Sequence, residues 1–372
     1  MIAILKREWK SYFQNITGWL FIAAVLALYG LYFLAYNLRA GYPYVSYTLS
    51  AISFIMLIAV PVLTMRSMAE ERHSRTDQLV LTAPVSLGKM IFGKFLAMVG
   101  VFTVAVAVIA VTPLVLAAFG TVPMGENYVA VLGFWLYGCT CIAVGMLASA
   151  LTESQVIAAV VAFAFLFLGY MMNSITGLIG DQLITKVLGA YDLYTPLQSF
   201  MSGCLDLTGV VYFVSVTGLC LFLTCQCVQK RRWSMTTKKL TTGMFSVAMI
   251  VVGFAVAVAV NLVVKEMPSS WTAVDATSTK LYSLTDTTKD YVKNLSQDVT
   301  IYVLSSEKSA DSTLAETLQR YEDLSKHLKV VYKDPEKSPN FYQQYTDSAP
   351  SQNSMIVESD ARSRVVDYSD VY

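Results

Sequence analysis

The sequence predicts a polytopic α-helical membrane protein followed by a small α/β domain. The 372 residues are 55% hydrophobic and only 14% charged, with a mean hydropathy of +0.53. A soluble domain has about 25% charged residues. The charges are also uneven: residues 1–264 carry 24 Lys, Arg, Asp and Glu, and residues 265–372 carry 29. This shift predicts a membrane part followed by a soluble part.

Seven apolar runs are long enough to cross a bilayer, which takes about 20 helical residues. They are Gly18–Tyr36, Tyr47–Met65, Phe95–Phe119, Tyr128–Leu151, Val156–Gly180, Thr208–Val228 and Leu240–Val264. None contains Asp, Glu, Lys or Arg. Since one such charge at mid-bilayer costs about 2.5–3.5 kcal/mol, their absence from every run favours seven membrane helices.

We therefore predict four parts along the chain. Residues 1–230 form a membrane domain of six spans, 231–239 a basic cytoplasmic linker, 240–264 a seventh span, and 265–372 an extracytoplasmic α/β domain.

Lys and Arg in the short loops predict the orientation. The N-terminus, the loop between the second and third runs, and the loop between the sixth and seventh runs carry thirteen of them, whereas the opposite loops carry only Arg39 and Lys186. The N-terminus is thus expected in the cytoplasm and the C-terminal domain outside a plasma membrane.

Composition argues against several function classes. The formal net charge of +1 gives no basic field for nucleic acid. Five of the six cysteines lie in apolar runs, and His73 and His327 fall on opposite sides of the predicted membrane. No metal constellation or catalytic triad is apparent, so no cofactor is expected on this chain.

One short motif resembles the start of a phosphate-binding loop. Gly88–Lys94 fits G-x-x-x-x-G-K, but Phe95 stands where Ser or Thr should hold magnesium, and no apolar strand leads into it. We instead expect a turn into the third span, with Lys94 at the lipid headgroups. ATP hydrolysis is then expected on another chain.

The loop of residues 66–94 is the longest predicted cytoplasmic segment. A charged stretch from Glu70 to Asp77 precedes the apolar Leu79–Leu81, and Pro84 ends any helix. Two interpretations are open: a solvated connector, or a short helix that docks into a groove of a cytoplasmic partner.

A resemblance favours the second interpretation. The segment A-E-E-R-x-x-x-T-x-x-L-x-L-T-A-P-V-S, followed by G-K-F at Gly93–Phe95, resembles the signature of ABC-2-type permeases. In that family it forms a coupling helix that touches a separate ATPase. A second similar stretch is G-M-L-A-S-A-L-T-E-S-Q-V-I-A-A at Gly145–Ala159. The gliding-motility (GldF-like) branch is the most similar, over residues 1 to about 230.

The resemblance implies functional positions. The coupling residues would be Glu70, Glu71, Arg72, Arg75, Thr76, Leu79, Leu81 and Pro84, and the second cytoplasmic turn would contain Thr152, Glu153 and Gln155. Relatives usually have glycine where this chain has Arg75, which predicts a local difference in the backbone. The implied partners are an ATPase that binds ATP and Mg, and a second permease half, either identical or related. The implied direction is export.

The seventh span has a counterpart in a second subunit of the gliding-type systems. Residues 240–372 resemble the start of that GldG-like subunit through Val274–Thr288, Asp298–Leu304 and Arg320–Ser325. The resemblance implies a fusion of two subunits. Because relatives continue further, it also implies a short or truncated form of the auxiliary domain.

Local patterns predict the α/β domain. Val299–Leu304 and Leu328–Tyr332 read as strands flanking an amphipathic helix in β-α-β order. Pro339–Tyr345 is expected as a short helix, and Met355–Glu358 with Val365–Tyr368 as a hairpin.

Two further expectations complete the prediction. Asp181–Leu207 is expected to contain an interfacial helix at the outer leaflet. The main functional alternative is a non-transporting scaffold that uses the same ATPase contact to move its exterior domain. A membrane enzyme is disfavoured, because intramembrane catalysis usually needs buried His, Asp, Glu or Cys–His groups, and of these the spans contain only cysteine.

Overall fold

The fold is known from a computed structural model. It describes residues 2–75, 86–178, 188–233, 239–265, 267, 273–276, 286–295, 297–306, 310–335, 338, 340–346, 350–359 and 362–371. The chain divides into two compact units, Met1–Glu266 and Met267–Tyr372.

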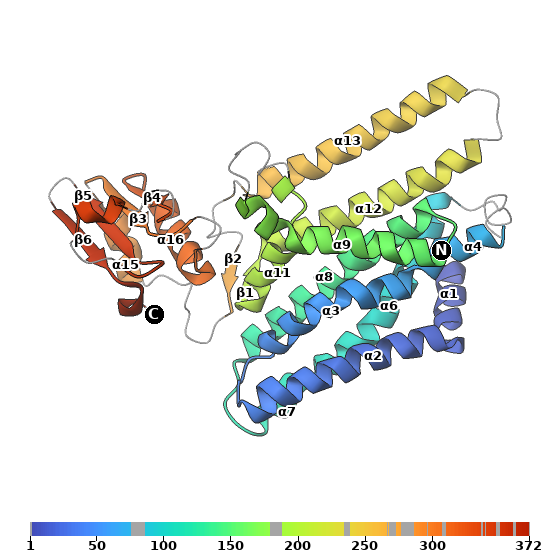
Figure 1. The fold of residues 1–372 in the computed structure, drawn as a ribbon, viewed down its shortest axis with the longest axis horizontal. Helices are drawn as coiled ribbons and strands as arrows, with labels where there is room; N and C mark the ends of the chain where they lie inside the picture. The colour runs from blue at the N-terminus through green and yellow to red at the C-terminus, as the bar shows by residue number, and fades with distance from the viewer. Residues whose placement is uncertain are drawn as a thin grey trace. The chain divides into compact units, whose positions relative to one another are not determined.

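The first unit is helical (Figure 1). Its helices are α1 (Ile2–Gln14), α2 (Ile16–Phe33), the π-helix η1 (Leu34–Arg39), α3 (Ser46–Thr64), α4 (Arg66–His73), α6 (Leu87–Ile109), α7 (Thr112–Ala117), α8 (Met124–Leu151), α9 (Gln155–Leu178), α11 (Tyr194–Met201), α12 (Leu207–Trp233) and α13 (Lys239–Lys265). The short strand β1 covers Cys204–Asp206.

Six of the predicted membrane helices are confirmed by length and composition. They are Ile16–Arg39, Ser46–His73, Leu87–Ala117, Met124–Leu151, Gln155–Leu178 and Leu207–Gln229. The seventh run lies in the 27-residue helix α13, of which Ala248–Val264 is apolar but shorter than a full span among the residues described.

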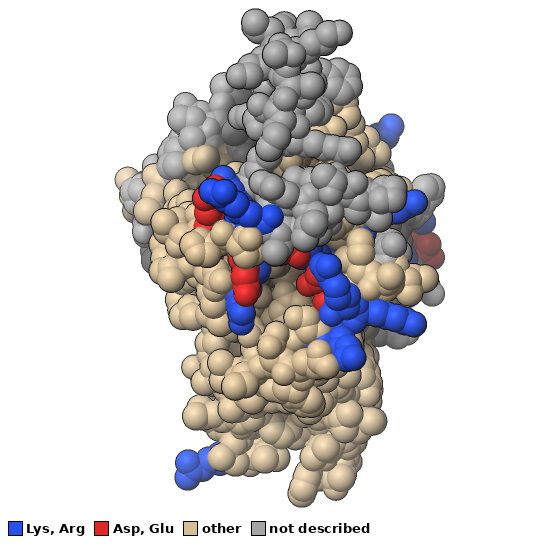
Figure 2. Space-filling view, turned by 90° about the vertical axis from the view of Figure 1, so that its right-hand side faces the viewer, with Lys and Arg blue, Asp and Glu red and all other residues tan. Residues whose placement is uncertain are grey.

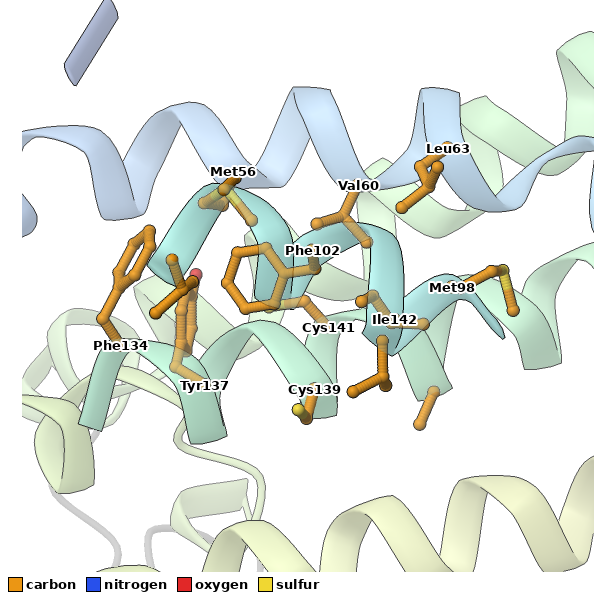
Figure 3. Packing of buried hydrophobic residues seen from close by; sticks show 14 of the residues in the cluster. Met56, Val60, Leu63, Met98, Phe102, Phe134, Tyr137, Cys139, Cys141 and Ile142 are labelled. Carbon is orange, nitrogen blue, oxygen red and sulfur yellow. The ribbon is translucent and has the colours of Figure 1, made fainter. Parts of the chain in front are cut away.

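Helix α8 is the centre of the first unit. In the apolar 18-residue stretch of α8 that could cross a membrane, 78% is buried, whereas the corresponding stretches of α2, α9 and α12 are each only 28% buried. Figure 3 shows Phe134, Tyr137 and Ile142 of α8 packed with Phe102 of α6 and with side chains of α3. A Cβ atom at Gly138 would overlap the Phe102 ring, so glycine permits the close approach of α6 and α8.

The third apolar run is broken near its end. Helix α6 ends at Ile109, and α7 starts at Thr112 with Pro113 in its first turn. Proline has no N–H to continue the earlier helix, but it is tolerated in a first turn. The run is therefore two helices rather than one.

A helix does form within Asp181–Leu207, and its expected position at the outer leaflet stays a prediction. Leu197 and Phe200 of α11 are fully buried, and α11 packs mainly against α8. The two apolar side chains are one helical turn apart, so both face the bundle. Residues 179–187 lie outside the part that the structure describes.

The second unit contains a four-stranded mixed sheet in the order β4-β3-β5-β6. The strands are β3 (Val299–Val303), β4 (Leu328–Tyr332), β5 (Met355–Ser359) and β6 (Arg362–Val366), with helix α16 (Ser312–Leu324) between β3 and β4. The strands β3 and β4 are parallel, whereas β5 is antiparallel to both β3 and β6. The predicted β-α-β unit and hairpin are thus confirmed.

Smaller elements complete the second unit. They are β2 (Ala273–Asp275), α15 (Asp286–Lys293) and the 3-10 helices η2 (Phe341–Gln344) and η3 (Tyr368–Asp370). The core includes Ile301 and Val303 of β3 with Leu314 and Leu318 of α16. On the other face of the sheet, Tyr302 contacts Phe341 and Tyr345.

Candidate functional site

The predicted coupling segment begins as helix α4. Only Met65 separates α4 from α3. Glu70, Glu71 and Arg72 all lie within α4. Arg75 follows two residues after its last residue. The remaining positions of this prediction, Thr76, Leu79, Leu81 and Pro84, lie outside the described residues.

A buried ion pair joins α4 to α6. The Lys94 side chain is only 3% exposed, and its Nζ atom donates to Glu71 Oε1 at 2.7 Å and to the Ser67 carbonyl oxygen at 3.1 Å. It also lies 3.4 Å from Glu8 Oε1 of α1. Lys94 is thus buried between helices instead of being exposed to lipid headgroups, and two carboxylates compensate its burial.

The glycines around Lys94 do not form a turn. Helix α6 starts at Leu87 after its N-cap Ser86, so Gly88 and Gly93 are both helical. A phosphate-binding loop needs consecutive backbone N–H groups that point at the ligand, and these N–H groups lie in or at the start of a helix. The motif has no phosphate-loop conformation.

Arg7 of α1 extends the same ionic cluster. Its Nη2 atom lies 2.6 Å from Glu8 Oε1 and 3.5 Å from Glu71 Oε1. The hydrogen bond to Glu8 is the main cause that raises the pKa of Arg7 above its ordinary value. Three helices that are separate in sequence, α1, α4 and α6, therefore meet at one group of charges.

A second ion pair anchors the start of α4. Arg66 donates to both oxygens of Glu70, at 2.7 and 2.9 Å, and to Thr17 Oγ1 of α2 at 3.2 Å. The bidentate geometry is favourable. Both side chains are more than a third exposed, so the pair contributes at most about 1 kcal/mol.

The two predicted cytoplasmic segments are in contact. Arg72 Nη2 lies 2.8 Å from Glu153 Oε1, and Arg72 Nη1 donates to the Leu151 carbonyl at 3.3 Å. Thr152 accepts a hydrogen bond from the Ser154 N–H, and Gln155 is the first residue of α9. The turn between α8 and α9 therefore contacts α4 through Arg72.

Ser149 of α8 caps α4 from a neighbouring helix. Its fully buried hydroxyl accepts from the N–H groups of Met68 and Ala69, each at 3.1 Å, and donates to the Met65 carbonyl at 3.0 Å. The first N–H groups of a helix have no partner inside it. Ser149 therefore provides the cap for the first turn of α4, since no side chain at the start of α4 forms one.

One turn earlier on α8, Gly145 lies against the end of α3. A Cβ atom at this glycine would overlap Thr64 Oγ1 and come within 3.1 Å of Thr64 Cγ2. Thr64 is fully buried. The second family-like stretch, Gly145–Ala159, thus packs against the junction of α3 and α4.

The backbone at Arg75 is unusual for an arginine. Its φ is +56°, in the left-handed region that favours glycine. This is the position where relatives of the resembled family usually have glycine. Arg75 therefore departs from the family pattern in residue type, but its backbone has a conformation that glycine readily adopts.

A cavity lined by polar and charged residues lies beside the ionic cluster. It has a volume of about 550 Å³ and is lined by residues of α1, α4 and α6, by Asn15 and Ser74, and by Thr17 of α2. Figure 2 shows Lys and Arg side chains next to Asp and Glu side chains on the face that carries this end of the unit. We call this end, with α1, α4 and the α8–α9 turn, the charged end.

Sequence reasoning missed Glu8, Arg66, Lys94 and Ser149 as parts of this site. A weak signal existed for two of them, because Lys94 and Ser149 lie inside the two stretches that carry the family resemblance. Arg66 had a local signal, since its partner Glu70 lies four residues later in the same helix. Glu8 had none, since its contact with Lys94 depends on how α1 packs. Among the residues that the structure describes, no group of three metal-binding side chains occurs.

Six helices of membrane-spanning length and composition define a polytopic membrane protein. Residues 40–228, about half of the chain, match the family model described as ABC-2 family transporter protein. The chain belongs to this family. Residues 278–370 match a domain of unknown function, DUF7088. No curated protein matches the chain.

Proposed function

We propose that this chain is the permease subunit of an ABC transporter, driven by ATP hydrolysis on a separate ATPase through the loop of residues 66–94. The observation that carries the proposal is the anchoring of α4. It follows α3 directly, and it contacts α6 through Glu71, α8 through Ser149 and the α8–α9 turn through Arg72.

This anchoring makes α4 a suitable input element. A force applied to α4 by a cytoplasmic partner reaches three membrane helices through short, partly buried contacts. Packed helices shift between discrete arrangements rather than deform continuously. A movement of α4 therefore changes how α3, α6 and α8 pack, which is what a transport cycle driven from the cytoplasm requires.

The remaining features follow from the same proposal. The charged end faces the cytoplasm, α13 is a seventh span, and the second unit lies outside. The subunit pairs with a second permease half and moves substrate outward. The family match and the excess of Lys and Arg at the predicted cytoplasmic side support this arrangement. Reporter fusions to residues 1, 235 and 372 test the orientation.

The test of the proposal is co-purification from mild-detergent membranes, with mass spectrometry of the bound proteins. Glu71 is a poor site for a variant, because its loss removes the shortest ion pair of the buried Lys94 and so affects stability as well as binding. The variant is therefore Leu79→Asp combined with Arg75→Glu, which leaves the Lys94–Glu71, Arg72–Glu153 and Ser149 contacts in place. The matched control is Arg39→Glu in η1, remote in sequence from the loop.

The expected result is an ATPase subunit that accompanies the wild type and the control but not the loop variant. A well-folded wild type that brings no ATPase contradicts the proposal. An ATPase that binds all three proteins equally contradicts the role of the loop.

The scaffold alternative makes a different prediction once the ATPase is bound. A permease requires that ATP hydrolysis be accompanied by movement of substrate in reconstituted vesicles. ATP hydrolysis that changes the protease sensitivity of the second unit, without flux, favours the scaffold.

A further inference from the structure

The cavity at the charged end has properties that the coupling role does not require. Three of its lining side chains are cations, Arg7, Arg66 and Lys94, and three are carboxylates, those of Glu8, Glu70 and Glu71. Its volume of about 550 Å³ is within the range of small-molecule sites, about 300–1,000 Å³.

The balance of charges selects the kind of ligand. The six ionisable side chains sum to zero when all are ionised. A simple anion would meet as many repulsive as attractive partners, and so would a simple cation. A zwitterion can place its anionic group near Arg7 and Arg66 and its ammonium near the carboxylates. Thr17 and Ser11 add hydroxyl groups to the lining.

The position of the cavity points to a lipid. It lies where α1 meets the start of α2, and the next residues of α2 expose apolar surface: Ile16 is 80%, Trp19 58% and Leu20 57% exposed. In a membrane protein such a surface faces acyl chains. Trp19, whose indole N–H donates to the Phe13 carbonyl at 3.0 Å, fits the interfacial belt where tryptophan is enriched.

Helix α1 has the character of an interfacial helix. Ile4, Tyr12 and Phe13 pack against the core, while Lys6 and Lys10 are on the exposed side. A helix of this kind lies in the plane of the headgroups. The cavity, which α1 lines, is therefore at headgroup depth.

We propose that this cavity binds the headgroup of a zwitterionic phospholipid with a primary ammonium, whose phosphate lies near Arg7 and Arg66 and whose ammonium lies near Glu8 and Glu70. The bound headgroup bridges α1, α2 and α4 and stabilises their arrangement. This binding does not depend on the proposed function, because it requires no ATPase.

The experiment uses the delipidated full-length chain in detergent and measures its melting temperature during lipid addition. The probes are phosphatidylethanolamine, phosphatidylcholine and phosphatidylglycerol with the same acyl chains, and soluble phosphoethanolamine. Native mass spectrometry counts the bound lipids. The variants are Arg66→Gln and Arg7→Gln, with Arg39→Gln as the matched control.

Phosphatidylethanolamine is expected to raise the melting temperature of the wild type and the Arg39→Gln control by about 3 °C in a saturable way. The shift should fall by at least half in the Arg7→Gln and Arg66→Gln variants. Because the Arg7 side chain is 59% exposed, Arg7→Gln remains informative even where Arg66→Gln does not fold.

Three outcomes overturn the proposal. Equal shifts with all three lipids mean general solvation by lipid. A phosphatidylethanolamine shift that both variants retain places the binding elsewhere. A shift of the same size from soluble phosphoethanolamine at the same concentration means that the ligand is a free phosphoester and not a membrane lipid.

Discussion

The Nζ atom of Lys94 lies 2.7 Å from Oε1 of Glu71, and this ion pair joins α6 to α4. The two residues are 23 positions apart, so the contact exists only because the two helices pack at the charged end. Since Lys94 is nearly inaccessible and Glu71 is 21% exposed, the pair is shielded from water. Removing the pair should lower the stability of the protein and, under the proposed function, weaken the coupling between α4 and α6.

A double-mutant cycle tests this pair. Lys94→Met removes the buried cation that Glu71 and Glu8 share, leaves them the more exposed Arg7, and should destabilise the protein by about 3 kcal/mol. Glu71→Gln should cost less, because Glu8 still faces Lys94. The double variant should recover about 1 kcal/mol relative to the sum of the two. Unfolding in mixed detergent measures the four free energies, and strict additivity would contradict the pairing.

Much of this architecture was predictable from sequence because apolar length is a local signal. Each of the six confirmed spans overlaps its predicted run, and the strands β3 and β4 begin at the predicted residues Val299 and Leu328. The topology of the mixed sheet was also partly predictable from sequence, since the β-α-β order leaves few possible arrangements of the strands.

The site was less predictable because its contacts are not local. Lys94 looks like a flanking cation when read along the chain, and only the packing of α1 and α4 shows that it is buried. The apolar residues of Asp181–Leu207 predicted an interfacial helix, but an amphipathic pattern does not reveal whether lipid or protein covers its apolar face. The position of α11 is set by the space that Gly133 of α8 leaves for Phe200.

The capping of α4 by Ser149 gives a second prediction. Ser149→Ala leaves two N–H groups in the first turn of α4 and the Met65 carbonyl without this hydroxyl, at a cost of about 2 kcal/mol. Hydrogen exchange at Met68 and Ala69 should accelerate selectively.

The control for this prediction is Ser53→Ala in α3. Ser53 is equally buried, but its hydroxyl donates only to the Ser50 carbonyl of its own helix. Its loss should therefore change stability little. Equal exchange rates in the Ser149 variant and the wild type would show that the hydroxyl does not cap α4.

The left-handed backbone at Arg75 gives a third prediction. Glycine adopts a φ of +56° without the clash that a Cβ atom causes, which costs about 1 kcal/mol. Arg75→Gly should therefore be more stable than Arg75→Ala, although both lose the same charge. Comparing their melting temperatures separates backbone strain from electrostatics. Equal values would indicate a different backbone conformation at this residue.

The contact between Gly145 and Thr64 gives the last prediction. Gly145→Ala places a methyl group against the buried Thr64 side chain, so α3 and α8 must separate at the point where α4 begins. Overpacking of this kind costs about 1–3 kcal/mol. The matched control is Gly218→Ala in α12, where a Cβ atom meets nothing within 4 Å.

Rescue distinguishes this clash from a general loss of stability. Thr64→Ala removes the Oγ1 and Cγ2 atoms that the new methyl group meets, and the lost hydroxyl only donates within α3. The double variant should therefore recover part of the lost stability and, under the proposed function, bind the ATPase better than Gly145→Ala alone. If Thr64→Ala instead adds its own destabilisation to that of Gly145→Ala, the two residues do not limit the approach of α3 and α8. The transmission of movement from α4 would then have to depend on the contacts of Ser149 and Lys94.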